Sequence, residues 1–131
     1  MIGHILNIAR SLVREHITKA LTRSNHWPTV RKAHLKDQPA CAACGGTSFL
    51  QVHHKLPFNE DPSKELDPTN FITLCMGSKF ECHVKIGHGG SFKMYNPNVE
   101  ADAKEALSHP ENFDKISAKA EANRKVNAPG N

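Results

Sequence analysis

Two adjacent histidines, His53 and His54, are the residues of this 131-residue chain best suited to do chemistry. They follow a short apolar run at residues 49–52, which indicates the end of a β-strand. Neighbouring side chains on a strand point to opposite faces, so the two imidazoles are expected to have different tasks. One would bind a metal ion while the other stays free to move a proton. Without the cysteines described next, a structural role for the pair in the core would be favoured.

Four cysteines bracket this histidine pair, two before it and two after it: Cys41, Cys44, Cys75 and Cys82. Cys41 and Cys44 are separated by two residues and followed by two glycines, which is the pattern of a zinc knuckle. Two thiolates at this spacing can reach one tetrahedral ion. The second pair strengthens the prediction of a structural zinc site. Disulfides are the alternative, which an oxidising compartment would favour.

The composition predicts one small domain with little hydrophobic core. Only 38% of the residues are hydrophobic and 6% are aromatic, so a staple such as a bound metal is expected. No apolar run of about 18 residues is present, and we therefore expect no transmembrane helix and no membrane partner. The first residues lack the pattern of a signal peptide. We expect the protein in the cytoplasm, where cysteines favour metals over disulfides.

The net charge of +4 is concentrated in the first third of the chain. Residues 1–40 carry seven Lys and Arg against two acids, whereas residues 41–99 carry five of each. Residues 100–131 carry five Lys and Arg against six acids. A basic segment beside a neutral metal site suits a polyanionic partner such as nucleic acid. A basic surface that only keeps the protein soluble would give the same pattern.

Hydrophobic spacing predicts the elements that must position these residues. Apolar residues at i, i+3 and i+4 predict an amphipathic helix over residues 2–23, which would pack on the core or a partner or place arginines near phosphates. A shorter basic helix is expected over residues 27–36, with a proline in its first turn. Strands are expected at residues 48–54 and 71–74, and a helix carrying the histidine after the last cysteine at residues 79–86.

The chain divides into three predicted parts. Residues 1–25 form the N-terminal amphipathic helix, residues 26–98 the domain with the cysteines and the histidine pair, and residues 99–131 a helical extension with a tail. Within the last part, a helix is expected at residues 100–108. Residues 110–131 hold few large apolar side chains and are expected to form a weakly packed helix that ends in a frayed tail.

Taken together, the motifs resemble the HNH endonuclease family, in particular its phage type. The matching strings are Cys41-x2-Cys44, Val52-His53-His54, Asn70-Phe71-Ile72-Thr73-Leu74-Cys75 and Cys82-His83. Residues 26–28 and 31–35 resemble the lead-in helix of phage-type members. The resemblance spans residues 26–96. It implies an α+β protein with a ββα-metal core, in which one catalytic divalent ion lies between a hairpin and a helix, flanked here by N-terminal and C-terminal helices.

The resemblance also implies a role for each motif residue. His53 and His83 match metal ligands, and His54 matches the general base. Asn70 matches the residue that braces the loop bearing the base, although it would also serve as a plain turn residue. The four cysteines match the ligands of the structural zinc. The catalytic ion would be Mg²⁺ or Mn²⁺, and because hard ions prefer oxygen ligands, imidazoles also suit Ni²⁺, Co²⁺ or Zn²⁺.

The chain departs from the family pattern between its last two cysteines, where six residues replace the usual two. Gly77 and Ser78 allow a loop, so Cys82 is still expected as the fourth zinc ligand, with a small buried thiol as the alternative. His88 follows His83 by five residues, about 140° around an ideal helix, and is a further candidate ligand only if the glycines bend it inward. The other histidines are expected at the surface or at an interface: His4, His16, His26, His34 and His109.

The function predicted from this resemblance is metal-dependent hydrolysis of DNA that leaves 5′-phosphate and 3′-hydroxyl ends. His54 would activate water, and the divalent ion would stabilise the phosphate and the leaving 3′ oxygen. Four basic residues are candidates to contact DNA: Arg31, Lys32, Lys36 and Lys85. For Lys85, a solvated surface position is the alternative. The helix over residues 2–23 would serve a homodimer or a phage protein partner.

The main alternative is a non-catalytic zinc module that binds nucleic acid. It explains the cysteines and the basic N-terminal segment, but it leaves the histidine pair without a role. A protein-interaction domain whose first helix docks a partner is a second alternative. If a phage encodes the chain, the cytoplasm in question is that of the bacterial host.

Overall fold

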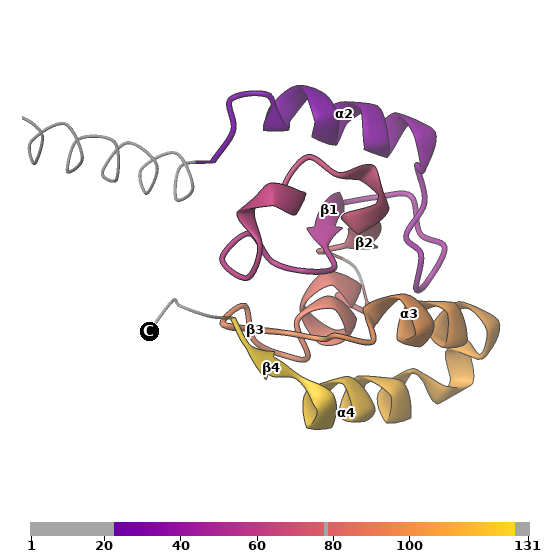
Figure 1. Cartoon of the computed structure of the whole chain (residues 1–131). Coiled ribbons are helices and arrows are strands. Elements are labelled where there is room, and N and C mark those ends of the chain that lie inside the picture. Colours follow the sequence, from indigo (N-terminus) through magenta and orange to yellow (C-terminus); the bar gives the residue numbers. More distant parts are fainter. Residues whose placement is uncertain (1–22, 78, 128–131) are drawn as a thin grey trace, which may run out of the picture.

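The computed structural model describes residues 23–77 and 79–127. They form a small α+β protein with two small antiparallel sheets and several helices (Figure 1). The predicted helix at residues 2–23, apart from its last residue, and the tail beyond residue 127 lie outside the described residues. The prediction that this helix binds a partner therefore also lies outside the described residues. Among the described residues, no helix has the length and apolar character needed to cross a membrane.

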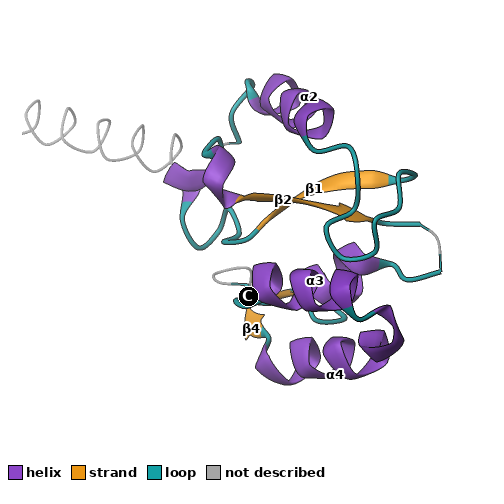
Figure 2. Ribbon diagram, turned by 90° about the vertical axis from the view of Figure 1, so that its right-hand side faces the viewer, coloured by secondary structure: helices purple, strands orange, loops and turns teal. Residues whose placement is uncertain are grey.

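Helix α2 (Trp27–Asp37) confirms the second predicted helix and covers one side of the hairpin (Figure 2). Trp27 and His34 both contact the ring of Phe71 edge-on, with centroids 5.4 and 5.5 Å away. The prediction that His34 lies at the surface is wrong, because its side chain is only 8% exposed. His34 follows Trp27 by seven positions, close to two helical turns, so the two lie on the same face of the helix.

A β-hairpin of β1 (Leu50–His54) and β2 (Phe71–Cys75) forms the centre of the protein. Its antiparallel register pairs Leu50 with Cys75 and His54 with Phe71. The hairpin therefore carries a cysteine at one end and the histidine pair at the other. Every residue of β2 is buried, because α2 lies on one side of the hairpin and the C-terminal helices lie on the other (Figure 2).

Two short 3-10 helices shape the loop between the strands, η1 (Pro62–Lys64) and η2 (Pro68–Asn70). Each has a proline in its first turn and an aspartate as its N-cap. The N-cap carboxylates accept hydrogen bonds from backbone N–H groups two residues further on, which satisfies donors that a helix start would leave unpaired. The turn-forming residues of this loop thus give it a defined shape.

The helix predicted over residues 79–86 is a short π-helical turn instead, η3 (His83–Gly87). The backbone N–H of His88 donates to the carbonyl of His83 at 3.0 Å, five residues earlier. This i to i+5 pattern is the mark of a π-helix, and it places residues five apart one above the other. Gly87 lacks a side chain where the space is tight, since a Cβ there would lie 3.1 Å from the ring of His53.

The C-terminal part consists of β3 (Met94–Tyr95), α3 (Val99–Ser108), η4 (Pro110–Asn112), α4 (Phe113–Asn123) and β4 (Lys125–Val126), with β4 paired to β3. The prediction of a weakly packed helix is wrong, because Phe113, Ile116 and Ala120 are buried. Their spacing forms one apolar stripe along α4, and that stripe packs toward the core.

The C-terminal helices hold η3 and the turn that follows it. Gly89 has a positive φ of 61°, and a Cβ at this position would lie 2.9 Å from the carbonyl oxygen of Ala120 in α4. The Arg124 guanidinium donates to the carbonyl of Gly89 at 3.0 Å. On the other side, the buried Asn96 amide donates to the carbonyl of Ile86 at 3.0 Å. These contacts fix a turn that is too short to be stable alone.

Candidate metal centres

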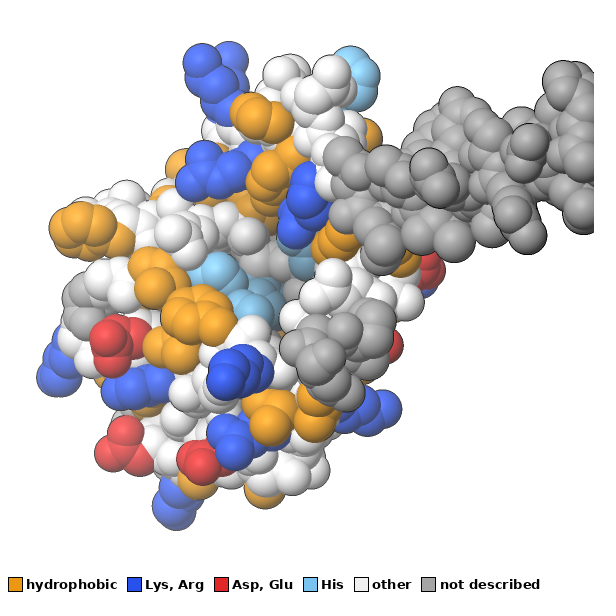
Figure 3. All heavy atoms as spheres, turned by 90° about the vertical axis from the view of Figure 1, so that its left-hand side faces the viewer, with side chains coloured by type: hydrophobic (Ala, Val, Ile, Leu, Met, Phe, Trp, Pro, Cys, Tyr) orange, Lys and Arg blue, Asp and Glu red, His pale blue; other side chains and the backbone are white. Residues whose placement is uncertain are grey.

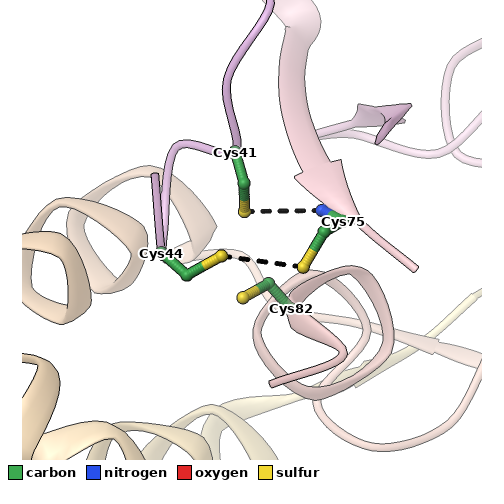
Figure 4. A group of neighbouring side chains, drawn as sticks. All are labelled: Cys41, Cys44, Cys75 and Cys82. Carbon is green, nitrogen blue, oxygen red and sulfur yellow. Dashed lines mark hydrogen bonds between the residues drawn. The ribbon is translucent and has the colours of Figure 1, made fainter. Parts of the chain in front are cut away.

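The four cysteines come together from three elements of the fold (Figure 4). Cys41 and Cys44 lie in the turn between α2 and β1, Cys75 ends β2, and Cys82 is the N-cap of η3. Their sulfur atoms all lie within 4.8 Å of one another, and Cys44 Sγ is 3.8 Å from Cys75 Sγ. The six-residue gap before Cys82 therefore does not keep it from the cluster. The group, in which no disulfide forms, could bind a metal such as zinc.

The electrostatics of this cluster favour a cation. A hydrogen bond from the Cys82 thiol lowers the pKa of Cys41 to about 5. Burial raises the pKa of Cys44 to about 11, and the hydrogen bond to Cys41 raises that of Cys82. A thiolate is therefore favoured at Cys41 and disfavoured at Cys44 and Cys82. A bound divalent cation would stabilise several thiolates at once, because the thiolate is the form that ligates metal.

A second cluster joins three histidines at the other end of the hairpin. His53 comes from β1, His83 begins η3, and His88 follows it directly. Their ligand nitrogens lie within 4.8 Å of one another. The ring centroid of His53 is 5.0 Å from that of His83 and 4.7 Å from that of His88. The spacing of His83 and His88 is unfavourable for a shared metal only on a regular α-helix. The π-helical turn brings residues five apart onto one side, so the nitrogens of His88 and His83 lie close together.

Hydrogen bonds set the tautomers of two of these rings. His88 Nδ1 donates to the carbonyl oxygen of Met94 at 2.7 Å, and His83 Nδ1 donates to the side-chain oxygen of Gln51 at 2.9 Å. A neutral imidazole carries one proton, so Nε2 of each ring holds a lone pair. The two Nε2 atoms are only 3.2 Å apart. Two lone pairs repel at this distance, whereas a metal ion would accept both.

Burial keeps these imidazoles neutral, which is the form that ligates metals. It lowers the pKa of His83 to about 4 and that of His53 well below its usual range, and the neighbouring histidines lower both further. His53 is 2% exposed, and its buried Nε2 has no hydrogen-bond partner among the described residues. A cluster of neutral, unprotonated nitrogens of this kind fits a cation.

His54 has a different environment from its neighbour. Its Nε2 lies 2.9 Å from the backbone carbonyl oxygen of Glu65, and its ring packs against Trp27 with centroids 4.5 Å apart. A carbonyl oxygen only accepts, so Nε2 carries the proton and Nδ1 holds the lone pair. Burial lowers the pKa of His54, which the hydrogen bond to Glu65 partly offsets. His54 is therefore a neutral group that can accept a proton.

Asn70 braces the loop that follows His54. Its side-chain oxygen accepts from the backbone N–H of Leu56 at 2.8 Å, and its amide nitrogen donates to the carbonyl of Leu56 at 3.0 Å. The same nitrogen donates to the carbonyl of Lys64 at 3.3 Å, one residue before Glu65. These bonds tie both ends of the loop together. Asn70 thus positions the backbone that holds His54.

Both histidine groups line one cavity of about 290 Å³. Figure 3 shows histidine side chains gathered in a hollow on this face, with Lys and Arg side chains around them. Its lining also includes Arg23 and Asn127. Of the residues predicted to contact DNA, Arg31, Lys32 and Lys36 lie on α2 outside this lining. Lys85 lines a separate cavity and lies 3.8 Å from the Glu81 carboxylate.

No site role was predicted for Gln51, Glu65 or Asn127, and Arg23 was predicted only as one of the arginines that the first helix could place near phosphates. Gln51 had a usable signal, because it precedes His53 by two residues and so shares its face of the strand. The contact between Arg23 and Glu65 joins residues 42 positions apart, and no local pattern indicates it. Asn127 reaches the cavity because β4 pairs with β3, which hydrophobic spacing did not predict.

The fold and the two clusters define a small α+β protein with two candidate metal centres, one of cysteines and one of histidines. Comparison of the chain with protein-family models, with curated proteins and with solved structures gives no significant match. The resemblance to HNH endonucleases therefore stays a prediction.

Proposed function

We propose that this protein is a metal-dependent endonuclease of the HNH type, which hydrolyses phosphodiester bonds of DNA. The observation that carries the proposal is the division of four histidines at one cavity between two chemical environments. Three of them offer ligand nitrogens to a common centre, whereas His54 is outside that group and keeps a lone pair at Nδ1. A hairpin followed by a helical turn also agrees with the order of elements that the family resemblance implies.

The residues that would hold the catalytic ion are His53, His83 and His88. Bound there, a divalent ion would supply charge stabilisation at the phosphate and at the departing 3′ oxygen. The cluster contains three imidazoles and no carboxylate among the described residues. Such a donor set favours Zn²⁺, Ni²⁺, Co²⁺ or Mn²⁺, whereas Mg²⁺ prefers oxygen ligands.

His54 takes the proton of the attacking water at Nδ1. The carbonyl of Glu65 accepts from Nε2–H and so fixes the direction of the lone pair at Nδ1. When the imidazolium forms, both nitrogens become donors, and the same carbonyl stabilises the added charge. Arg23 lines the cavity with a half-exposed side chain, and its positive charge attracts the phosphate backbone.

The cysteine cluster has a structural role in this proposal, with Zn²⁺ as its ion. It joins the turn before β1, the end of β2 and the start of η3. His83 directly follows Cys82, so a zinc ion bound to the cysteines sets the position of the first histidine of η3 relative to β1. The structural ion thereby places the ligands of the catalytic one.

A plasmid-nicking assay tests the proposed function. The protein should convert supercoiled DNA to nicked or linear forms with at least one of Mn²⁺, Ni²⁺, Co²⁺, Zn²⁺ or Mg²⁺, and EDTA should stop the reaction. Electrophoretic mobility shift of the same DNA gives binding independently. Binding without cleavage in every metal would overturn the proposal in favour of the non-catalytic zinc module.

A further inference from the structure

Glu65 is a buried carboxylate in the loop between the two strands. Its side chain is 5% exposed, and it accepts from Arg23 Nε at 3.0 Å and from the backbone N–H of Ser24 at 3.1 Å. A carboxylate loses the stabilisation of water on burial, so it is kept inside only when paired and hydrogen-bonded. A buried and paired carboxylate on a loop indicates that the fold holds Glu65 in one defined position.

The backbone of the same residue holds His54. The carbonyl oxygen of Glu65 accepts from His54 Nε2 at 2.9 Å, and the preceding carbonyl, that of Lys64, accepts from the Asn70 side chain. Asn70 therefore fixes this backbone from inside the loop. Arg23 and Ser24 fix it from outside, through the Glu65 side chain.

The segment that binds Glu65 also contacts the His54 ring. The backbone N–H of Trp27 donates to the carbonyl of Ser24 at 3.3 Å, which closes a turn at residues 24–27. From this turn, the Trp27 ring packs on His54 with centroids 4.5 Å apart. The Arg23 guanidinium lies 4.6 Å from the ring centre of Phe58, which holds it over the same loop. One short segment thus contacts both the imidazole and the residue that orients it.

We propose that Glu65 is a positioning residue for His54, and that its ion pair with Arg23 locks the imidazole in the tautomer and orientation that catalysis needs. The inference rests on the proposed nuclease function and extends it to two residues outside the family motifs. A one-ångström error in placing a catalytic group costs on the order of a hundredfold in rate, so a carboxylate that only orients a carbonyl can control turnover.

Glu65→Gln tests the inference in the full chain, because it keeps the shape of the side chain and removes its charge. We expect kcat for plasmid nicking to fall about tenfold or more while KM for DNA changes less than about twofold. Glu100→Gln is the matched control. It removes an exposed ion pair with Lys55 that has the same 3.0 Å separation, and it should leave both constants unchanged.

The ¹⁵N NMR shifts of His54 give a readout that does not depend on activity. In the zinc-loaded protein, Nε2 should be protonated and Nδ1 unprotonated, and Glu65→Gln should produce a mixture of tautomers with the zinc content unchanged. If Glu65→Gln fails to fold, Arg23→Gln breaks the same ion pair from its exposed side and should change the tautomer in the same way.

The outcomes separate the inference from the function on which it rests. An unchanged tautomer with unchanged kcat in a folded variant overturns the positioning role, even if the wild-type protein cuts DNA. A wild-type protein that cuts no DNA overturns the nuclease proposal, whereas the tautomer result still decides whether Glu65 orients His54. A rise in KM alone would mean that the pair binds substrate and does not position the base.

Discussion

The two clusters are built from the same hairpin and the same helical turn, yet their surroundings differ. Cys41, Cys75 and Cys82 are at most 1% exposed and belong to the hydrophobic core. The histidines line a cavity of about 290 Å³. Four protein ligands close a metal site, whereas three leave a position for water or substrate. Under the proposed function, the cysteine end provides stability and the histidine end provides the chemistry.

Through η3, the histidine end depends on the cysteine end, but the cysteine end does not depend on the histidine end. Cys82 and His83 are neighbours, so loss of the cysteine cluster would displace a histidine ligand. Loss of a histidine leaves the packed cysteine cluster and its core contacts in place. Changes at the cysteines should therefore alter both ends of the molecule, and changes at the histidines should alter only one.

Cys41→Ser should have the largest effect. Structural zinc contributes on the order of 10 kcal/mol to small domains of this kind, so the variant should lose zinc and unfold. Thermal melting together with metal analysis measures both losses. Ser48→Ala, at an exposed position between Cys44 and β1, is the control and should melt like the wild type. A Cys41 variant that lacks zinc and keeps the wild-type melting temperature would break the comparison.

Acid should weaken the histidine end specifically. His83 has a folded pKa of about 4, below the unfolded value of 6.5, so between these pH values the unfolded state binds more protons. Its contribution to the free energy of unfolding should be complete above pH 6.5 and fall as the pH drops toward 4, by on the order of 3 kcal/mol in total. Urea unfolding at pH 7.5, 6 and 5, with the histidine site free of metal, follows this loss.

His83→Gln isolates that contribution, because any acid effect on the cysteine end is common to both proteins. The wild type should lose stability more steeply below pH 6.5 than the variant does. Parallel curves for the two proteins would show that His83 is not the group that titrates.

Gln51→Ala should have a smaller effect that is confined to the histidine end. Its side-chain oxygen accepts from His83 Nδ1 and fixes that tautomer. Loss of such a partner typically weakens metal binding about 10- to 100-fold. Competition with a coloured chelator would measure affinity at this site, while the tightly bound zinc should be unchanged. Gln38→Ala, an exposed glutamine, is the matched control. Equal affinities for the two variants would contradict the assigned tautomer.

The sequence was sufficient for the parts of the site that local spacing encodes. The two cysteine pairs, both strands and the helix that begins at Trp27 follow from short motifs and from apolar periodicity. The structure brings all four predicted cysteines together and places Asn70 where it braces the loop. Apart from the meeting of the two cysteine pairs, which also needs η3, these features depend on contacts within a hairpin or a single turn.

The remainder depends on contacts between distant segments. His88 joins its partners because α4 holds the turn after η3, through Arg124 and Gly89, 35 residues apart. The spacing rules of an ideal α-helix could not anticipate a π-helical turn that tertiary packing stabilises. The buried His34 and the link from Arg23 to Glu65 likewise arise where α2 and its first turn meet the hairpin. Neither contact leaves a periodic pattern in the sequence.

The nicking rate of His54→Ala tests the central claim most directly. General-base catalysis contributes about 10²- to 10⁴-fold, so cleavage should fall by that factor with melting temperature and metal content unchanged. His109→Ala, which removes an exposed histidine paired with Glu111, should cut like the wild type. A His54→Ala protein that cuts DNA at the wild-type rate would contradict the account.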